Sequence, residues 1–402
     1  MLDALRWFVD EQHILACLSV TGGSRDQAYH AAYGRIREKD ASGEAVPLTA
    51  DSLFDLASIT KLFTALTVLR LREEGLLDLH RPVTDYAPQF AQLREVSVET
   101  VLTFGAALRT PSRVDTQPDR EAGLHELFRI AAFPRGNERA YSDMHAMVLK
   151  YVIEGVSGLP YFDCLQGRIL RPLGMRDTFA QVPESERCRA ASCDLEHRIE
   201  GESWIVRRGV APGTVHDPKA RLLSLNGADL CGHAGLFSTQ GDMTRFCQGM
   251  LQGKVVSDES LRFMAQNRTG HPLPEGGYTQ YLGCQCYVKH PDQYFSEIPL
   301  AMGHRAFGIS GFTGHHLAID PERGIFTLFL GDRVLNRLTV LIPPPGKSFT
   351  DYGLNPAGYG SLTWRDGRTV YSSANYVHQK DARLHAPLAR LLGWLPADSG
   401  SP

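Results

Sequence analysis

The segment Phe54–Lys61 constrains this chain most, because it places a serine and a lysine three residues apart where a helix-forming run, 62–75, begins. Residues three apart share a helix face, so the Ser58 hydroxyl and the Lys61 amine are predicted to lie a hydrogen bond apart. A neutral lysine can take a serine proton, and burial or a nearby cation keeps a lysine neutral. The stretch predicts an acyl-transfer centre, against the alternative that Ser58 caps the helix and Lys61 is a surface charge.

The composition narrows the class of protein. The chain has 402 residues, of which 43% are hydrophobic and 22% charged, with a net charge of -3. This length predicts one large domain with an inserted subdomain, or two domains. The small net charge predicts no nucleic acid partner, and no apolar run reaches the roughly 18 residues of a membrane span. The N-terminus lacks the pattern of a secretory signal, so we expect a cytoplasmic protein with reduced cysteines.

The cysteine pattern predicts no metal site. Cys284 and Cys286 lie near His290, but one Cys-x-Cys pair falls short of the four ligands of a structural zinc site. Residues two apart in a strand face the same side, which predicts that both cysteines pack in a core.

Periodicity predicts an α+β fold. Apolar residues recur at helical spacing in the segments 2–12, 144–156, 160–169, 242–251, 257–267 and 382–395. Extended segments are predicted at 13–20, 27–36, 278–288, 312–319 and 325–330, the first two as a hairpin turning at Gly22-Gly23. Strands at both chain ends predict one antiparallel sheet domain, residues 1–75 and 270–402, with a mainly helical subdomain, 76–269, inserted. Residues 343–375 are predicted to form a surface excursion, and the junction of sheet and insertion a ligand cleft.

Two further segments complete a pattern with Ser58. Tyr141-Ser142-Asp143 precedes the helix at 144–156, and Gly308–Gly314, which contains Ile309-Ser310-Gly311-Phe312, opens a strand. With Phe54–Lys61, these segments resemble the serine beta-lactamase and penicillin-binding-protein superfamily, and most closely its class C beta-lactamase and esterase-like branch. The resemblance runs from about Phe54 to Arg333. It includes Val215-His216-Asp217 and the segment from Gly232, in which His233 is expected to be a turn residue near the cleft.

The resemblance implies a role for each residue. Ser58 would attack an ester or amide carbonyl, and Lys61 and Tyr141 would share its proton and pass it to the leaving group. The backbone N–H groups of Ser58 and Phe312 would form the oxyanion hole. Asp143 either bonds to Lys61 or caps the helix that follows it. Asp143, Ile309, Ser310 and Gly311 would bind substrate, and no metal or organic cofactor is implied.

Two departures from the family pattern affect the expected substrate. Many relatives carry lysine or histidine where this chain has Ile309, and that cation attracts a substrate carboxylate. His304 or Arg305 could supply this cation only if the segment were aligned in a different register. Both are expected to be ordinary surface residues. The segment Val101–Leu108 lacks the histidine and Ser-Gly that relatives commonly place beside the nucleophile.

Three functions follow from these observations. The preferred one is a serine hydrolase that acts on a small ester or amide without a required carboxylate. The second is a D-alanyl-D-alanine carboxypeptidase or beta-lactamase. The third is a non-catalytic ligand-binding relative that keeps the fold. The altered segment Ile309-Ser310-Gly311, called the third motif below, favours this function, and the intact Ser58, Lys61 and Tyr141 oppose it.

Overall fold

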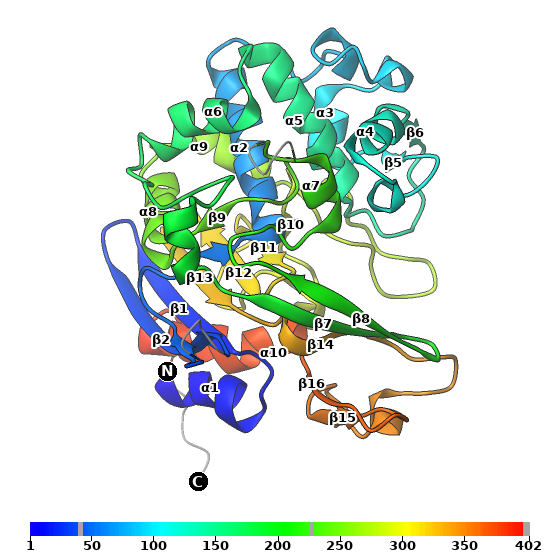
Figure 1. Ribbon diagram of the computed structural model, residues 1–402. Helices are drawn as coiled ribbons and strands as arrows, with labels where there is room; N and C mark the ends of the chain where they lie inside the picture. Colours follow the sequence, from blue (N-terminus) through cyan, green and yellow to red (C-terminus); the bar gives the residue numbers. More distant parts are fainter. Residues whose placement is uncertain (39–42, 225–228, 397–402) are drawn as a thin grey trace.

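Seven antiparallel strands from both ends of the chain form the first sheet of the computed structural model, which describes residues 1–38, 43–224 and 229–396. Figure 1 shows N-terminal and C-terminal strands side by side in this sheet. The strand order is β10 (Tyr287–Val288), β11 (Phe307–Gly311), β12 (His315–Asp320), β13 (Ile325–Gly331), β1 (Cys17–Ser24), β2 (Ala28–Arg37) and β3 (Val46–Pro47). The predicted α+β class is therefore confirmed, with its antiparallel sheet built from both ends.

The first hairpin is confirmed, but its predicted turn is wrong. Gly22 and Gly23 lie inside β1 and pair with Tyr29 and Ala28. A Cβ atom on Gly22 would lie 2.6 Å from a methyl carbon of Leu392, so this glycine makes room for the C-terminal helix rather than for a turn.

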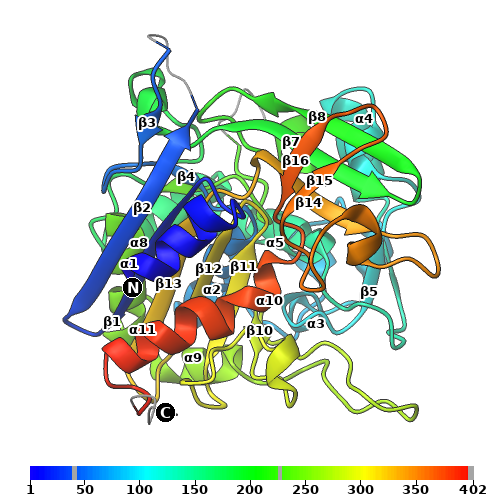
Figure 2. The ribbon, with the colours of Figure 1, turned by 90° about the horizontal axis from the view of Figure 1, so that it is seen from below.

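Helices from the two termini cover one face of this sheet. They are α1 (Leu2–Arg6), α10 (Tyr376–Lys380) and α11 (Ala386–Leu391), the last two joined by a helical turn at 381–385. Figure 2 shows α1 in blue and the C-terminal helices in red across the sheet. Phe8, Leu384 and Leu388 pack there against Phe329 of β13, so the predicted terminal helices are confirmed.

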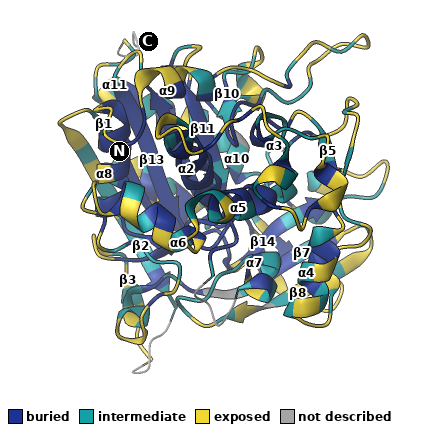
Figure 3. Ribbon diagram, turned by 90° about the horizontal axis from the view of Figure 1, so that it is seen from above, coloured by how far each residue is buried: buried dark blue, intermediate teal, exposed yellow. Residues whose placement is uncertain are grey.

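The opposite face of the sheet packs against α2 (Thr60–Glu73), which is buried along most of its length (Figure 3). Phe63 of α2 stacks on Phe246 of α8 with ring centroids 4.2 Å apart. The remaining helices are α3 (Val98–Leu102), α4 (Arg120–Phe128), α5 (Asp143–Ser157), α6 (Tyr161–Leu165), α7 (Pro218–Leu223), α8 (Gln240–Leu251) and α9 (Asp258–Met264). Ser58 lies at the start of α2. This packing holds α2 rigidly between the sheet and other helices.

A second sheet, which the sequence did not predict, lies beside the first. Its order is β15 (Ser361–Thr363), β16 (Thr369–Ser372), β14 (Leu335–Ile342), β7 (Cys193–Glu200) and β8 (Ser203–Val210). β14 pairs in parallel with β7, so the inserted region and the C-terminal region share this sheet. The segment 343–375, expected as a surface excursion, contributes two of the strands, and Leu354 and Leu362 are buried in the core of the second sheet.

The strand boundaries near the third motif also differ from the prediction. Only Tyr287–Val288 of the segment 278–288 is strand, and β11 ends at Gly311. The chain turns at 312–314, where the Gly314 N–H donates to the Gly311 carbonyl and Gly314 has φ +121°. The turn therefore occupies the place where a strand was expected to begin. The short strands β4 (Phe54–Asp55), β5 (Ala107–Arg109), β6 (Ala131–Phe133) and β9 (Phe237–Ser238) form two small pairs.

Replacing Gly155 with alanine is expected to destabilise the protein by about 1–3 kcal/mol. Its Cβ would lie 1.8 Å from the Tyr86 carbonyl oxygen, so α5 must move away from that backbone. Gly167 is a matched control because a Cβ there meets nothing within 4 Å. Gly167→Ala is expected to leave stability unchanged or slightly increased. Urea unfolding of both variants checks this, and equal stabilities would contradict the close packing of α5 on Tyr86.

Candidate active site

Ser58 lies in a single 3-10 turn, Ala57–Ile59, directly before α2. Ala57 has φ +46°, a conformation that is strained for a residue with a side chain. The Asp55 carboxylate holds this bend, because it accepts hydrogen bonds from the N–H groups of Ala57 at 2.9 Å and His216 at 2.7 Å. The Ser58 side chain makes no capping bond to the helix. The alternative that Ser58 only caps the helix is therefore wrong.

Lys61 is completely buried and points at Ser58. Its Nζ donates to Ser58 Oγ at 2.8 Å and to the His233 carbonyl at 3.3 Å, and it lies 2.8 Å from Asp143 Oδ1. Burial acts to lower the pKa of Lys61, but Asp143 and Tyr141 raise it above its ordinary value. A raised pKa keeps Lys61 protonated in this resting state. The prediction that Lys61 is neutral is therefore wrong for this state.

Asp143 bonds to Lys61, which settles the two alternatives left open above. The helix that follows is capped instead by Ser142, whose Oγ accepts the Met144 N–H. Asp143 Oδ2 also pairs with Lys219 Nζ at 3.1 Å. Burial would raise the pKa of Asp143, but the cations Lys61, His233 and Lys219 hold it well below its usual value.

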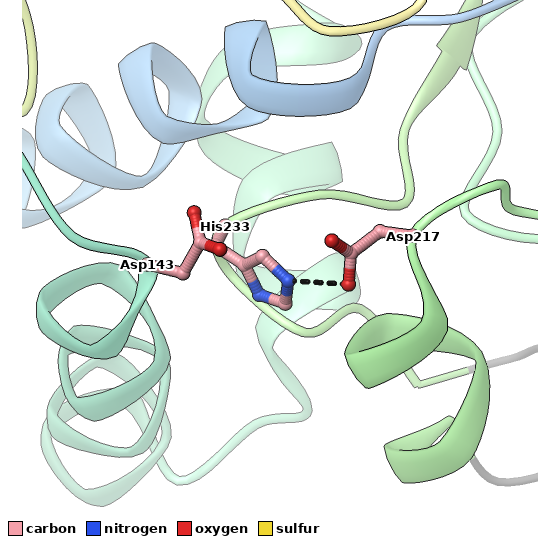
Figure 4. A group of neighbouring side chains, drawn as sticks. All are labelled: Asp143, Asp217 and His233. Atoms are coloured by element: carbon pink, nitrogen blue, oxygen red, sulfur yellow. Dashed lines mark hydrogen bonds and ion pairs between the residues drawn. The ribbon is translucent and has the colours of Figure 1, made fainter. Parts of the chain in front are cut away.

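An ion pair between the half-buried Asp217 and the buried His233 completes this charge network beside Asp143 (Figure 4). His233 Nε2 lies 2.9 Å from Asp217 Oδ1, and Lys219 lies 3.3 Å from Asp217 Oδ2. Burial acts to lower the pKa of His233, but Asp217 raises it to about 10, so the imidazole is charged at neutral pH. Among these groups three cations, Lys61, Lys219 and His233, face two carboxylates. The network therefore carries one excess positive charge.

Asp143, Asp217 and His233 have ligand atoms within 4.8 Å of one another, as in a metal site. Their oxygens are already engaged, because Asp143 pairs with two lysines and Asp217 pairs with His233 and Lys219. A divalent cation would face two ammonium groups and an imidazolium. The donor set fits an internal ion network and does not fit a metal ion.

Tyr141 lies against Lys61, whose Nζ is 4.9 Å from the centre of the phenol ring. The ring stacks on Tyr287 at 5.4 Å and contacts Phe104 at 5.8 Å. Phe104 stands in the segment that departs from the family pattern, and it is buried with φ +57°. Phe104 thus gives Tyr141 an aromatic support.

The residues of the third motif lie partly on the cavity wall and partly in the core. Ser310, Gly311 and Phe312 line the same cavity as Ser58, about 550 Å³ in volume. Ile309 is completely buried in the main core, because alternate residues of β11 face opposite sides of the sheet. Its assignment as a substrate-binding residue is therefore wrong. Gly311 permits a close approach, since a Cβ there would lie 2.7 Å from the Leu56 carbonyl oxygen.

A buried ion pair from distant parts of the chain holds Ser310. Lys380 Nζ, on α10, donates to Ser310 Oγ at 2.5 Å and lies 2.9 Å from Glu297 Oε2. Ser310 Oγ in turn donates to Glu297 Oε2 at 2.6 Å. A cation therefore does reach the third motif, but from the C-terminal helix, and Glu297 neutralises it.

The rest of the cavity wall is strongly charged. Arg198 and Glu200 of β7 and Arg207 of β8 line one side, so the second sheet contributes to the site. Arg139 is exposed on the wall, with its guanidinium carbon 5.6 Å from the centre of the Tyr141 ring. Within the described residues no carboxylate forms an ion pair with Arg139.

The remaining sequence candidates lie elsewhere. Cys284 and Cys286 are fully buried in the main core, as predicted, although in a loop rather than a strand. His304 and Arg305 are exposed, and Arg305 lies 3.9 Å from Glu322, so both are the surface residues expected.

Comparison with known proteins identifies the family. The family model described as Beta-lactamase matches residues 7–337. The chain belongs to the beta-lactamase family of serine hydrolases. The "D-alanyl-D-alanine-carboxypeptidase/endopeptidase AmpH" of Escherichia coli K12 is 27% identical over 240 residues, which are 56% of this chain and 55% of that protein. This chain thus matches only about half the length of that relative.

Solved structures share the fold at low identity. A penicillin-binding protein homologue from Caulobacter crescentus has a TM-score of 0.64 at 20% identity, covering 82% of this chain and 90% of its own. "EstCE1, a hydrolase with promiscuous acyltransferase activity" has a TM-score of 0.63 at 18% identity, covering 82% and 92%. At these identities the similarity shows the fold alone. Among the described residues, no helix combines the length and the apolar character needed to cross a bilayer.

Sequence reasoning missed part of the site. Asp55, Lys219, Glu297 and Lys380 carried no motif signal of their own. Asp217 and His233 were noticed only as parts of family-like segments. The pair Asp217-Pro218 is a helix-start signature that predicts a carboxylate of fixed position. In the structure, Asp217 accepts a hydrogen bond from the Ala220 N–H and caps α7.

Proposed function

We propose that this protein is a serine esterase or amidase that works through an acyl-enzyme on Ser58. The observation that carries the proposal is the hydrogen bond of 2.8 Å between Ser58 Oγ and the buried Lys61, at the surface of a cavity of about 550 Å³. A serine that bonds to a fixed cation in a cavity of this size has the surroundings of a nucleophile rather than of a structural hydroxyl.

Tyr141 is the proton acceptor in this proposal. Lys61 is already protonated, so it cannot take the Ser58 proton itself. The excess positive charge shared by Lys61, Lys219 and His233 favours electron-rich groups beside it, and the Tyr141 ring lies 4.9 Å from Lys61 Nζ. Lys61 then holds Ser58 and stabilises Tyr141.

The reaction proceeds in two halves. Ser58 Oγ forms a bond to the substrate carbonyl carbon while its proton passes to Tyr141, and the backbone N–H groups of Ser58 and Phe312 stabilise the oxyanion. The carbon–oxygen or carbon–nitrogen bond to the leaving group breaks as that group receives the proton. Water then attacks the acyl-enzyme by the reverse route and releases the acid. Side chains and backbone complete this chemistry, so the proposal requires no cofactor.

The substrate is proposed to be a small ester or amide that needs no carboxylate, rather than a nucleic acid or a membrane lipid. At the third motif, the charge of Lys380 is cancelled by Glu297 at 2.9 Å. A neutralised pair attracts a substrate anion far less than a lone cation does.

A D-alanyl-D-alanine carboxypeptidase or beta-lactamase activity is the second candidate. Arg139 favours it, because an arginine on the cavity wall without an ion pair among the described residues suits a carboxylate. The Escherichia coli relative, named as a D-alanyl-D-alanine-carboxypeptidase/endopeptidase, agrees with such an activity.

One set of assays separates these functions. Wild-type protein is expected to react with a fluorophosphonate probe and to hydrolyse p-nitrophenyl acetate, and Ser58→Ala is expected to lose both activities. Turnover of a chromogenic cephalosporin or of a D-alanyl-D-alanine peptide would favour the second candidate. Absence of labelling and of all turnover would contradict both enzymatic functions. It would favour a non-catalytic ligand-binding protein that keeps the fold.

A further inference from the structure

A second cavity, about 700 Å³ in volume, adjoins the catalytic one. Tyr287, Glu297 and Val377 line both cavities, so the two are direct neighbours. The second cavity is formed mainly by the segment between α9 and β11, which contains β10 (Figure 2). Its volume matches the size of cavities that hold drug-sized molecules.

Aromatic side chains dominate the lining of this second cavity. Tyr278 and Phe295 are 43% and 60% exposed, although large aromatic side chains are usually more deeply buried. His290 contacts the rings of Tyr278 at 5.5 Å, Tyr281 at 5.0 Å and Phe295 at 6.1 Å. These edge-to-face contacts order the aromatic wall before any ligand arrives, and exposed, ordered aromatic surface inside a cavity marks a binding site for an apolar group.

The position of Tyr141 shows which half of a substrate enters this cavity. In the proposed reaction, Tyr141 gives its proton to the leaving group, so the leaving group lies on the Tyr141 side of Ser58. Tyr287 stacks on Tyr141 at 5.4 Å and extends from there into the aromatic cavity. The acyl half is left with the wall that carries Arg198 and Arg207, which offers charged groups in place of a cluster of aromatic rings.

We propose that the aromatic cavity binds the leaving group of the substrate, and that this group is an alcohol or amine bearing an aromatic ring. This inference rests on the proposed function, because it uses the role of Tyr141. It assigns the alcohol or amine half of the substrate a chemical class that the catalytic residues alone leave open.

The test compares three esters in two pairs that share ethyl acetate. Ethyl acetate and 2-phenylethyl acetate differ only in the alcohol, and both alcohols are simple aliphatic leaving groups. Ethyl acetate and ethyl 3-phenylpropanoate differ only in the acyl group. We expect kcat/KM for 2-phenylethyl acetate to exceed that for ethyl acetate by about tenfold or more, with no similar gain in the acyl pair.

The double variant Tyr278→Ala, Phe295→Ala is expected to reduce the ratio of the two acetate values by about tenfold. Phe133→Ala is the matched control, because Phe133 is a similarly exposed aromatic residue outside both cavities, and it should leave the ratio unchanged. Equal rates for the two acetates, an unchanged ratio in the double variant, or a preference in the acyl pair would each overturn the inference.

Calorimetric titration with 2-phenylethanol separates this inference from the proposed function. Wild-type protein is expected to bind the alcohol about tenfold more tightly than the double variant does. If no ester is hydrolysed but this difference in binding is found, the proposed function fails and the aromatic cavity stands as a binding site. If 2-phenylethanol binds equally to both proteins, the cavity assignment fails.

Discussion

Replacing Lys61 with methionine is expected to lower kcat/KM for ester hydrolysis by about 10³-fold. Methionine keeps most of the buried volume but removes the ammonium that bonds to Ser58 Oγ at 2.8 Å. The same change removes the cation nearest the Tyr141 ring and the excess positive charge of the network. Both the nucleophile and its proton acceptor therefore lose their fixed partner. Steady-state rates with p-nitrophenyl acetate measure the effect.

Lys150→Met is the matched control for this experiment. Lys150 is also a buried lysine in an ion pair, with Glu154 at 3.1 Å and Asp229 at 3.2 Å, but it lies outside the catalytic cavity. It should reduce stability while leaving kcat/KM within about twofold. A Lys61→Met protein with wild-type rates would contradict the role assigned to Lys61. Partial recovery of its rate at alkaline pH would support Tyr141 as the proton acceptor, whereas no recovery would favour Lys61 itself.

Local patterns explain how much of the fold could be predicted. The β1–β2 hairpin, α2 and α5 each bury one contiguous segment, so apolar spacing within that segment is sufficient. The second sheet depends on parallel pairing between β7 and β14, which lie far apart in the chain. No local pattern records such a pairing, and the charged residues of β7 face the cavity and hide its strand periodicity.

Local sequence patterns likewise predict some features of the site and not others. The contact between Ser58 and Lys61 follows from a short motif whose spacing fixes its geometry, and Tyr141 follows from the family resemblance. The charge state of Lys61 does not, because it depends on Asp143, which is distant in the chain and whose own charge depends on Lys219 and His233. The prediction for Ile309 failed because a motif gives the order of residues but not the face of the strand on which each side chain lies.

Lys380→Met is expected to destabilise the protein by about 3–5 kcal/mol, because it leaves the Glu297 carboxylate buried without its cation. Burial acts to raise the pKa of Glu297, but Lys380 and Ser310 hold it below its ordinary value in the wild-type protein. The stabilisation is therefore present above pH 4.5 and is lost as Glu297 becomes protonated. The difference in unfolding free energy between wild type and Lys380→Met should be largest at neutral pH and shrink below about pH 4.5.

Two comparisons make the effect of Lys380 specific. Lys289→Met removes a partly buried lysine whose hydrogen bond partner, among the described residues, is the Pro299 carbonyl alone, and it is expected to destabilise the protein by about 1 kcal/mol. The double variant Glu297→Gln, Lys380→Met removes the unpaired charge and should regain most of the lost stability. Because Ser310 is held by both groups, kcat/KM should fall in Lys380→Met even at temperatures where the variant is fully folded. If urea unfolding and ester hydrolysis show Lys380→Met and Lys289→Met to be alike, the C-terminal helix does not hold the third motif, and the neutrality of that part of the cavity needs another cause.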